Sequence, residues 1–297
     1  MIKNQKKAYA FALISILFWS TSASAFKISL KYVDEVILLL ISSFISSLCF
    51  LIILIFKNKL NEIKAITKKN LFKSICLGFF NPFFYYVILF KAYSLLLAQQ
   101  AQPINMTWGI VIAILSIPLL KQKLSIWDVV ALFISFFGVI VIATKGNLSN
   151  FAISNISGVV LAVISSFIWA VYWLLNTKDK LDPVLRLFYN FTFGFIFTLV
   201  YYLVCYKVTM PHVYGVLGGV YIGLFEMGIT FYFWILAMKY TNATVKISIL
   251  VYIAPFISLI FIYFFVGEKI LFSSVFGLIF IVSGILIQLY KKKAQRM

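Results

Sequence analysis

One acidic residue lies far from every loop of this chain. Of eight Asp and Glu residues, seven fall in polar segments or at the ends of apolar runs, whereas Glu226 sits in the middle of the run 213–238. It is about 13 residues, or roughly 19 Å of helix, from either end of that run. A carboxylate at this depth is costly unless it faces water, pairs or protonates. We predict that Glu226 binds a cationic or amine group of a substrate or carries a coupling proton; the alternative is a protonated side chain that hydrogen-bonds a neighbouring helix.

Amide side chains form a second group of candidate binding residues. Gln99, Gln102 and Asn105 are spaced by three in the apolar run 96–120, so they lie near one face of a helix. Amides buried this deeply must find partners, and they face protein or a cavity rather than lipid. Two interpretations stay open, which are hydrogen bonding to a substrate and attachment of one helix to another.

Aromatic residues inside the apolar runs form the third group. Trp169 and Tyr172 follow a helical spacing with Trp173 adjacent, and Trp19 and Trp108 occupy other runs. Interfacial aromatic belts are the usual explanation for such residues, but Trp169 lies well inside its run, where a belt does not reach. The pattern favours a planar or aromatic substrate held by stacking.

These side chains must be positioned by membrane-spanning helices. The 297 residues are 63% hydrophobic and only 11% charged, whereas a soluble domain carries about 25% charged residues. A water-soluble fold of this composition would not have enough polar and charged residues to cover its surface. We predict an all-α integral membrane protein, because runs of roughly 20 apolar residues match the thickness of a bilayer. Hydropathy predicts ten spans, at 8–30, 36–56, 71–93, 96–120, 124–143, 156–176, 184–206, 213–238, 242–265 and 271–290.

The basic residues predict the orientation of these spans. The formal charge of +18 would suggest nucleic acid in a soluble protein. Here 19 Lys and Arg residues fall on one side of the spans and six on the other, so the positive-inside rule explains the surplus and no nucleic-acid partner is expected. The bias predicts that both termini lie in the cytoplasm. The protein is expected in the inner, cytoplasmic membrane of the cell. Lys246, within the ninth span, is predicted to reach the cytoplasmic interface rather than to pair with Glu226.

The two halves of the chain, 1–147 and 148–297, resemble each other. Leu77-Gly78-Phe79-Phe80-Asn81 matches Ile222-Gly223-Leu224-Phe225-Glu226, so Asn81 is the counterpart of Glu226 at similar depth. With five spans, each half would enter the membrane from the opposite face. This predicts a 5+5 inverted-topology repeat, in which a substrate site near the midplane lies between the halves. For Asn81, which precedes Pro82, a helix bend and a binding site are equally good interpretations.

The chain also resembles the drug/metabolite transporter superfamily of the EamA type. The residues that carry this resemblance are Phe18-Trp19-Ser20-Thr21, Ala254-Pro255, Gly267-Glu268-Lys269 and a glycine in the last span of each half. Asn105-Met106-Thr107-Trp108-Gly109 and Phe167-Ile168-Trp169-Ala170-Val171-Tyr172 look like the aromatic amino-acid exporter branch. That branch usually has Trp-Pro where this chain has Trp108-Gly109. The resemblance implies two EamA-type repeats and a central cavity lined by spans 1, 3, 4, 6, 8 and 9.

The predicted function is secondary transport of a small organic metabolite by alternating access. The sequence has no Gly-x-x-x-x-Gly-Lys loop, so the expected energy source is a gradient or exchange, with proton coupling through Glu226 as one form. The expected substrate is an aromatic amino acid or another planar metabolite; the alternative is uptake of a vitamin such as riboflavin. An intramembrane enzyme or a channel subunit is the further alternative. The expected partners are a small-molecule substrate and the lipid bilayer, and no catalytic residue, metal or cofactor is predicted.

Overall fold

The computed structural model describes residues 3–120, 126–147, 155–176, 179–242 and 244–294. Every regular element in these ranges is a helix. The helices of the first half are α1 (Gln5–Ser29), α2 (Glu35–Phe56), α3 (Leu60–Lys64), α4 (Lys68–Gly78), η1 (Phe79–Phe84), α5 (Tyr85–Leu95), α6 (Ala98–Asn105), α7 (Trp108–Leu120) and α8 (Ile126–Ala143). Those of the second half are α9 (Ile156–Asn176), α10 (Pro183–Cys205), α11 (Val213–Phe225), α12 (Ile229–Tyr240), α13 (Thr244–Leu250), η2 (Val251–Ile253), α14 (Ala254–Phe261), η3 (Ile262–Val266) and α15 (Phe272–Ala294).

Polar residues between the apolar runs fix where several helices begin. The Asp34 carboxylate accepts the backbone N–H groups of Val36 and Ile37 at 2.9 and 2.8 Å and so caps α2. Asp182 caps α10 in the same way, with Pro183 in the first turn. These caps satisfy amides that a helix start leaves without partners, and proline costs nothing in a first turn.

Seven helical segments are long and apolar enough to cross a membrane, and each coincides with a predicted span. They are Gln5–Ser29, Glu35–Phe56, Lys68–Leu95, Ile156–Asn176, Pro183–Cys205, Val213–Tyr240 and Ile247–Val266. Two further apolar helices are shorter, Val129–Ala143 and Phe272–Ile287. The all-helical fold is therefore confirmed for the described residues, and the total of ten spans stays a prediction.

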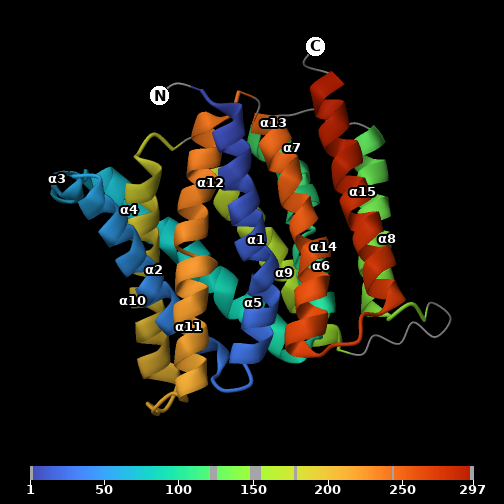
Figure 1. Cartoon of the computed structure of the whole chain (residues 1–297), viewed down its shortest axis with the longest axis horizontal. Helices are drawn as coiled ribbons and strands as arrows, with labels where there is room; N and C mark the ends of the chain where they lie inside the picture. The colour runs from blue at the N-terminus through green and yellow to red at the C-terminus, as the bar shows by residue number, and fades with distance from the viewer. Residues whose placement is uncertain (1–2, 121–125, 148–154, 177–178, 243, 295–297) are drawn as a thin grey trace.

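Three of the predicted spans are interrupted near their middles. Between α4 and α5, Asn81 has the extended angles φ −147° and ψ 121°. α11 ends at Phe225 and α12 begins at Ile229, so the two stack end to end (Figure 1). α6 and α7 meet at Met106 and Thr107. Such interruptions are tolerated at membrane depth only where protein or a cavity satisfies the freed backbone groups.

The helices pack as neighbouring pairs along a bundle. α2 lies against α10 and α11, α1 against α12 and α14, and α5 against α9, while α8 and α15 stand together at one end (Figure 1). The last pair approaches closely at Gly138 and Gly277, since a Cβ on Gly138 would lie 2.6 Å from the carbonyl oxygen of Gly277. Only glycine permits that separation of the two backbones.

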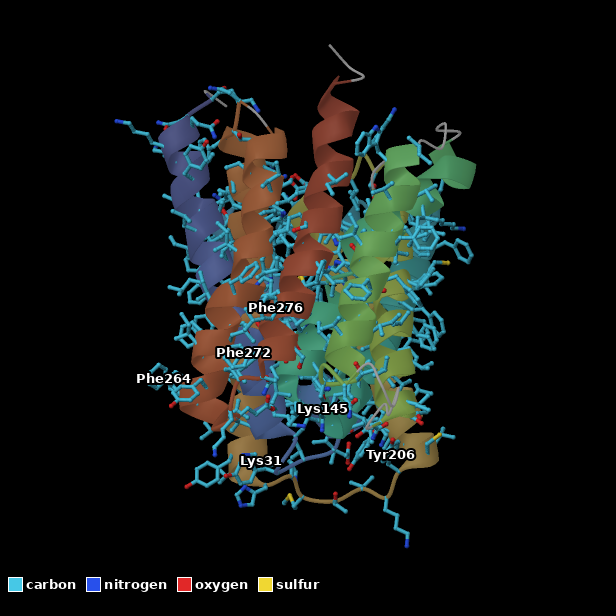
Figure 2. The ribbon with its side chains drawn as sticks, turned by 90° about the vertical axis from the view of Figure 1, so that its right-hand side faces the viewer. Lys31, Lys145, Tyr206, Phe264, Phe272 and Phe276 are labelled. Atoms are coloured by element: carbon cyan, nitrogen blue, oxygen red, sulfur yellow. The ribbon has the colours of Figure 1, made fainter. Side chains whose placement is uncertain are left out.

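The bundle has two distinct faces. α1 begins and α15 ends at one face, which we call the terminal face (Figure 1). Lys31, Lys145 and Tyr206 lie at the opposite face, which we call the far face (Figure 2). The predicted orientation places the terminal face in the cytoplasm.

A buried arginine fastens the α9–α10 loop at the terminal face. Arg186 is 3% exposed, and its Nη1 donates to the carbonyl of Asn70 at 2.8 Å and to Ser74 Oγ at 2.5 Å. Its Nε lies 2.6 Å from Asp179 Oδ2. Burial alone would raise the pKa of the Asp179 carboxyl, but the Leu181 N–H and the guanidinium outweigh burial and hold that pKa below its ordinary value. The ion pair therefore stabilises the charged carboxylate.

Candidate functional site

A cavity of about 360 Å³ lies in the middle of the bundle. Its wall is built by both halves of the chain, from α1, α5, α6 and α7 in the first half and α9, α12, α13 and α14 in the second. Small-molecule sites commonly measure roughly 300–1,000 Å³ and are mostly apolar with a few polar groups. The cavity has the size and position of a site for one small ligand.

Tryptophan dominates the cavity wall. The chain has six tryptophans, and five of them line this cavity, which are Trp19, Trp108, Trp169, Trp173 and Trp234. They contact one another and nearby rings, with centroids 5.2 Å apart for Trp19 and Trp234 and 6.0 Å for Trp169 and Trp173. These indoles come from α1, α7, α9 and α12, so only the fold brings them together.

Glu226 lies at the break between α11 and α12 and faces the cavity. Tyr86 Oη donates to Glu226 Oε1 at 3.0 Å, and Ser22 Oγ donates to Oε2. Both donors belong to the first half of the chain, whereas the carboxylate belongs to the second. Two hydroxyl donors stabilise a carboxylate without neutralising its charge. Among the described residues no cation forms an ion pair with it.

Amides of α6 complete the polar part of the wall. Asn105 accepts a hydrogen bond from Tyr85 Oη at 3.2 Å and donates through Nδ2 to Ser165 Oγ at 2.8 Å. Gln102 also lines the cavity, and its Oε1 has no hydrogen-bond partner among the described residues. Asn105 therefore joins α5 to α9, while Gln102 keeps one acceptor free for a ligand.

Gly109 stands where the aromatic amino-acid exporter branch usually has proline, and it leaves room for a tyrosine side chain at the cavity wall. A Cβ at Gly109 would lie 2.7 Å from the hydroxyl of Tyr252. Tyr252 stacks on Trp108 with centroids 6.0 Å apart. The glycine thus leaves room for Tyr252, which belongs to η2, beside Trp108. A Cβ at this position would require the tyrosine side chain to shift.

Buried aromatic side chains form the far end of the cavity. Tyr93 and Phe26 line it there and are only 2% and 3% exposed. Lys27 Nζ donates to the carbonyls of Tyr93 and Leu96 at 2.8 and 2.5 Å, at the end of α5. These two bonds tie α1 to the turn between α5 and α6.

A carboxylate fastens the same turn from the other half. Glu268 accepts the backbone N–H groups of Ala98 at 2.7 Å and Gln99 at 3.2 Å, which are the first amides of α6. The Gln99 amide donates to the Lys269 carbonyl at 2.9 Å and accepts the Leu271 N–H at 2.7 Å. We call Lys27, Gln99 and Glu268 the far-face latch.

The opposite end of the cavity reaches the terminal face. Its lining there consists of Trp173, Met238 and Ser248. Each lies within four residues of the end of its helix at the terminal face, in α9, α12 and α13 respectively. All three side chains are half-buried. The lining is therefore less buried toward the terminal face than toward the far face in this conformation.

Seven of the ten predicted site residues line the cavity: Trp19, Gln102, Asn105, Trp108, Trp169, Trp173 and Glu226. The other three lie outside it. Gln99 belongs to the far-face latch, and Tyr172 is buried with its hydroxyl accepting a hydrogen bond from Asn190 at 3.2 Å. Asn81 is fully buried at the α4 break, and neither amide atom has a hydrogen-bond partner among the described residues. The Lys246 side chain lies outside the described residues.

Sequence reasoning missed several residues of the site. Ser22 and Tyr86 hold the carboxylate, and Tyr85, Trp234 and Tyr252 add to the wall. A usable signal was the pair Tyr85-Tyr86, which follows the only proline of its predicted span. Among the described residues, no group of three His, Cys, Asp or Glu side chains could hold a metal ion.

Comparison with known proteins identifies relatives along the chain. The model described as the EamA-like transporter family matches residues 6–144 and 156–290. An uncharacterized transporter of Archaeoglobus fulgidus is 28% identical over 206 residues, covering 67% of this chain and 70% of the relative. The uncharacterized transporter YyaM of Bacillus subtilis is 26% identical over 247 residues, covering 80% of this chain and 78% of the relative. A protein of known crystal structure shares the fold, with a TM-score of 0.69 at 20% identity over 99% of this chain and 100% of its own.

Proposed function

Because the chain belongs to the EamA-like transporter family, we propose that it moves a small planar organic molecule across the cytoplasmic membrane by alternating access. The observation that carries this proposal is the central cavity, which five tryptophans line around one carboxylate. Indole rings present flat apolar faces and stack on planar ligands. An aromatic amino acid and a vitamin such as riboflavin are the specific substrates that the resemblance suggests.

In alternating access, the cavity would close at one face of the bundle while it opens at the other. In the present conformation the far-face latch is intact, and the lining toward the terminal face is half-buried. For substrate to leave at the far face, the bonds from Lys27 and Glu268 to the α5–α6 turn must break while the terminal end closes. An inverted repeat supplies two states of similar energy for such a cycle, and we propose that the halves 1–147 and 148–297 form one.

Glu226 is the proposed coupling residue. It lies at a helix break, and its partners Ser22 and Tyr86 belong to the other half, so a movement of the halves changes its surroundings. A carboxylate that alternates between bound proton and bound substrate links transport to a proton gradient. The excess of Lys and Arg on loops of the terminal side supports a cytoplasmic location for both termini.

Transport by purified protein in liposomes tests the proposal. Labelled tryptophan, phenylalanine and riboflavin are compared with an aliphatic amino acid and a sugar, in protein-free and protein-containing vesicles. We expect uptake of one or more planar compounds and a weaker apparent affinity in Trp169→Ala. Trp127→Ala is the matched control, because Trp127 is the tryptophan outside the cavity and is 51% exposed. Equal uptake of the aliphatic compound or the sugar, insensitive to Trp169→Ala, would contradict the proposal.

A further inference from the structure

The segment that joins α2 to α4 carries a positive charge that its own acid does not balance. Six lysines fall between residues 57 and 73, and Glu62 is the only acid among these residues. We call residues 57–73 the basic segment. Its ion pairs join Lys59 to Glu62 and Asp182 at 3.0 and 2.9 Å, and Lys73 to Asp179 at 3.2 Å. Lys64, Lys68 and Lys69 are exposed and form no ion pair among the described residues.

The other acids of the chain lie too far away to balance these three lysines. The chain has eight acids, and three of them, Glu62, Asp179 and Asp182, belong to the ion pairs of the basic segment. The remaining five are Glu226 in the cavity wall, Asp34, Glu35 and Glu268 toward the far face, and Asp128 in α8. α8 stands at the opposite end of the bundle from α3 (Figure 1). The positive charge of the basic segment is therefore available to an external anion.

Exposed apolar side chains lie beside the same lysines. Phe72 is 69% exposed and follows Lys68 and Lys69 by four and three residues in α4. Leu60 is 46% exposed and precedes Lys64 by four residues in α3. Residues three or four apart in a helix are neighbours on its surface. Each of the three lysines thus has an exposed apolar neighbour one helical turn away.

The basic segment is held against the bundle. The Tyr189 hydroxyl donates to the Ile63 carbonyl at 2.6 Å, and Ile63 and Ile66 pack on the core. Lys57 Nζ lies 4.8 Å from the centroid of the Tyr232 ring. These contacts order the segment without a ligand, which lowers the entropy that a ligand loses by ordering its site.

We propose that the basic segment binds an anionic phospholipid, with the phosphate at Lys64, Lys68 and Lys69 and the acyl chains against Leu60 and Phe72. Ammonium groups next to apolar side chains at the end of a membrane-spanning helix complement both parts of such a lipid. A soluble anion would use the ammonium groups alone, and a zwitterionic lipid brings no net charge. The positive-inside rule explains the number of lysines on this side, but by itself it predicts no lipid preference of the folded protein.

Lipid binding to the detergent-purified protein tests the proposal. Phosphatidylglycerol and phosphatidylcholine with identical acyl chains are titrated, and bound lipid is counted by native mass spectrometry. We expect phosphatidylglycerol to bind at least about tenfold more tightly, because each lysine near an anionic lipid contributes several-fold. The difference should shrink as salt screens the charges. Equal binding of the two lipids at low salt would overturn the proposal.

Glycerophosphate separates a lipid site from a simple anion site. It carries the phosphate without acyl chains, so it gains nothing from Leu60 and Phe72. We expect glycerophosphate at the concentration of the lipid to leave phosphatidylglycerol bound. Displacement of the lipid under these conditions would assign the surface to soluble anions and overturn the proposal.

Replacement of the three lysines locates the site. The combined variant Lys64→Gln, Lys68→Gln and Lys69→Gln should bind the two lipids about equally. The matched control removes the same charge from α15, at the other end of the bundle (Figure 1), by Lys291→Gln, Lys292→Gln and Lys293→Gln. The control should keep the preference. Equal loss in both variants would show a response to net charge alone and overturn the proposal.

Lysine reactivity on the unchanged protein gives a second measure where the triple variant fails to fold. Acetylation in liposomes, assigned to each lysine by peptide mass spectrometry, should slow several-fold at Lys64, Lys68 and Lys69 when phosphatidylglycerol replaces phosphatidylcholine. The lysines 291–293 report the general effect of the anionic surface. Equal slowing of both groups would overturn the proposal. None of these measurements involves the transported substrate, so the proposed transport function is tested separately.

Discussion

The hydroxyl of Tyr86 donates a hydrogen bond to Glu226 Oε1 at 3.0 Å, and this bond joins the two halves of the chain. Ser22 donates to the other oxygen from the same half as Tyr86. The charged group of the cavity wall is therefore held by one half and contributed by the other. A rearrangement of the halves would change the hydrogen bonding of the carboxylate, as the proposed coupling to its protonation requires.

Replacing the carboxylate by an amide should uncouple transport from pH. Glu226→Gln retains the size of the side chain but replaces one acceptor oxygen by an NH2 donor, so one of the two hydroxyls must accept instead of donate. The neutral amide cannot release a proton or form an ion pair with a cation. We expect a folded protein in which uptake in liposomes is strongly reduced and no longer responds to an imposed pH gradient. A pH response of the variant equal to that of the unchanged protein would remove Glu226 from the coupling mechanism.

Removal of one cavity indole should weaken binding of an aromatic ligand. Trp169 contacts Tyr85 and Trp173 in the wall, and its truncation to alanine removes a large apolar face. We expect Trp169→Ala to reduce the affinity for a planar aromatic ligand by about 1–3 kcal/mol, the scale of burying one large side chain. Thermal stabilisation across a ligand titration measures the change. Trp127→Ala serves as control, and unchanged affinity in Trp169→Ala would assign Trp169 to packing alone.

Weakening the far-face latch should admit reagents from the far side. Glu268→Ala removes the acceptor of the Ala98 and Gln99 N–H groups, and charge-assisted bonds of this kind contribute about 1 kcal/mol or more. A shift of that size changes a population about fivefold. Ala23→Cys, in a background without native cysteines, places a thiol on the cavity wall. We expect its labelling by a membrane-impermeant reagent from the far side to accelerate several-fold.

The control for this experiment is another acid at the far face. Glu35 pairs with Lys91 at 3.0 Å and makes no bond to the α5–α6 turn, so Glu35→Gln should leave the labelling rate unchanged. Equal rates in the Glu268 variant and the unchanged protein would show that the latch does not close the cavity.

The ion pair at the terminal face should make stability depend on acid pH. The pKa of Asp179 is lowered in the folded protein, so its contribution is present above the ordinary carboxyl pKa and is lost as the pH falls below about 4. We expect Asp179→Asn to lower the unfolding free energy by about 2 kcal/mol at neutral pH, because Arg186 loses a charged partner. Thermal unfolding at pH 7 and at a pH well below 4 measures both effects. Glu62→Gln, in an exposed pair, should change stability by less than about 1 kcal/mol.

The predicted orientation is tested by labelling near both ends of the chain. Single cysteines at residues 2 and 295, in a background without native cysteines, should react with an impermeant reagent only from the cytoplasmic side. The basis is the excess of Lys and Arg on one side of the spans. A terminus that reacts from outside would overturn the orientation and with it the assignment of the terminal face.

The depth of each residue in the membrane could be predicted from the sequence alone. Runs of apolar residues report the bilayer thickness, so the seven segments long enough to span it coincide with predicted spans. The same depth scale singled out Glu226, because a carboxylate far from both ends of an apolar run is conspicuous without any knowledge of its neighbours.

The direction of each side chain required the tertiary structure. Gln99 shares a helical face with Gln102 and Asn105, yet it caps a turn at the far face while the other two line the cavity. Asn81 was paired with Glu226 by the repeat but lies buried beside α10 rather than in the cavity. Helical spacing determines which residues share a face of a helix. It does not determine which other helix, turn or cavity each part of that face contacts.

The sequence by itself determined the helical membrane fold, the family and the depth of Glu226 within its apolar run. Only the tertiary structure decided that five tryptophans converge on one cavity, that Ser22 and Tyr86 hold Glu226, and that buried aromatic side chains form the far end of the cavity. The physical reason is that hydrophobic thickness is a property of local composition, whereas a binding site is made of contacts between helices far apart in the chain. Those contacts depend on packing and on three helix breaks that composition alone does not locate.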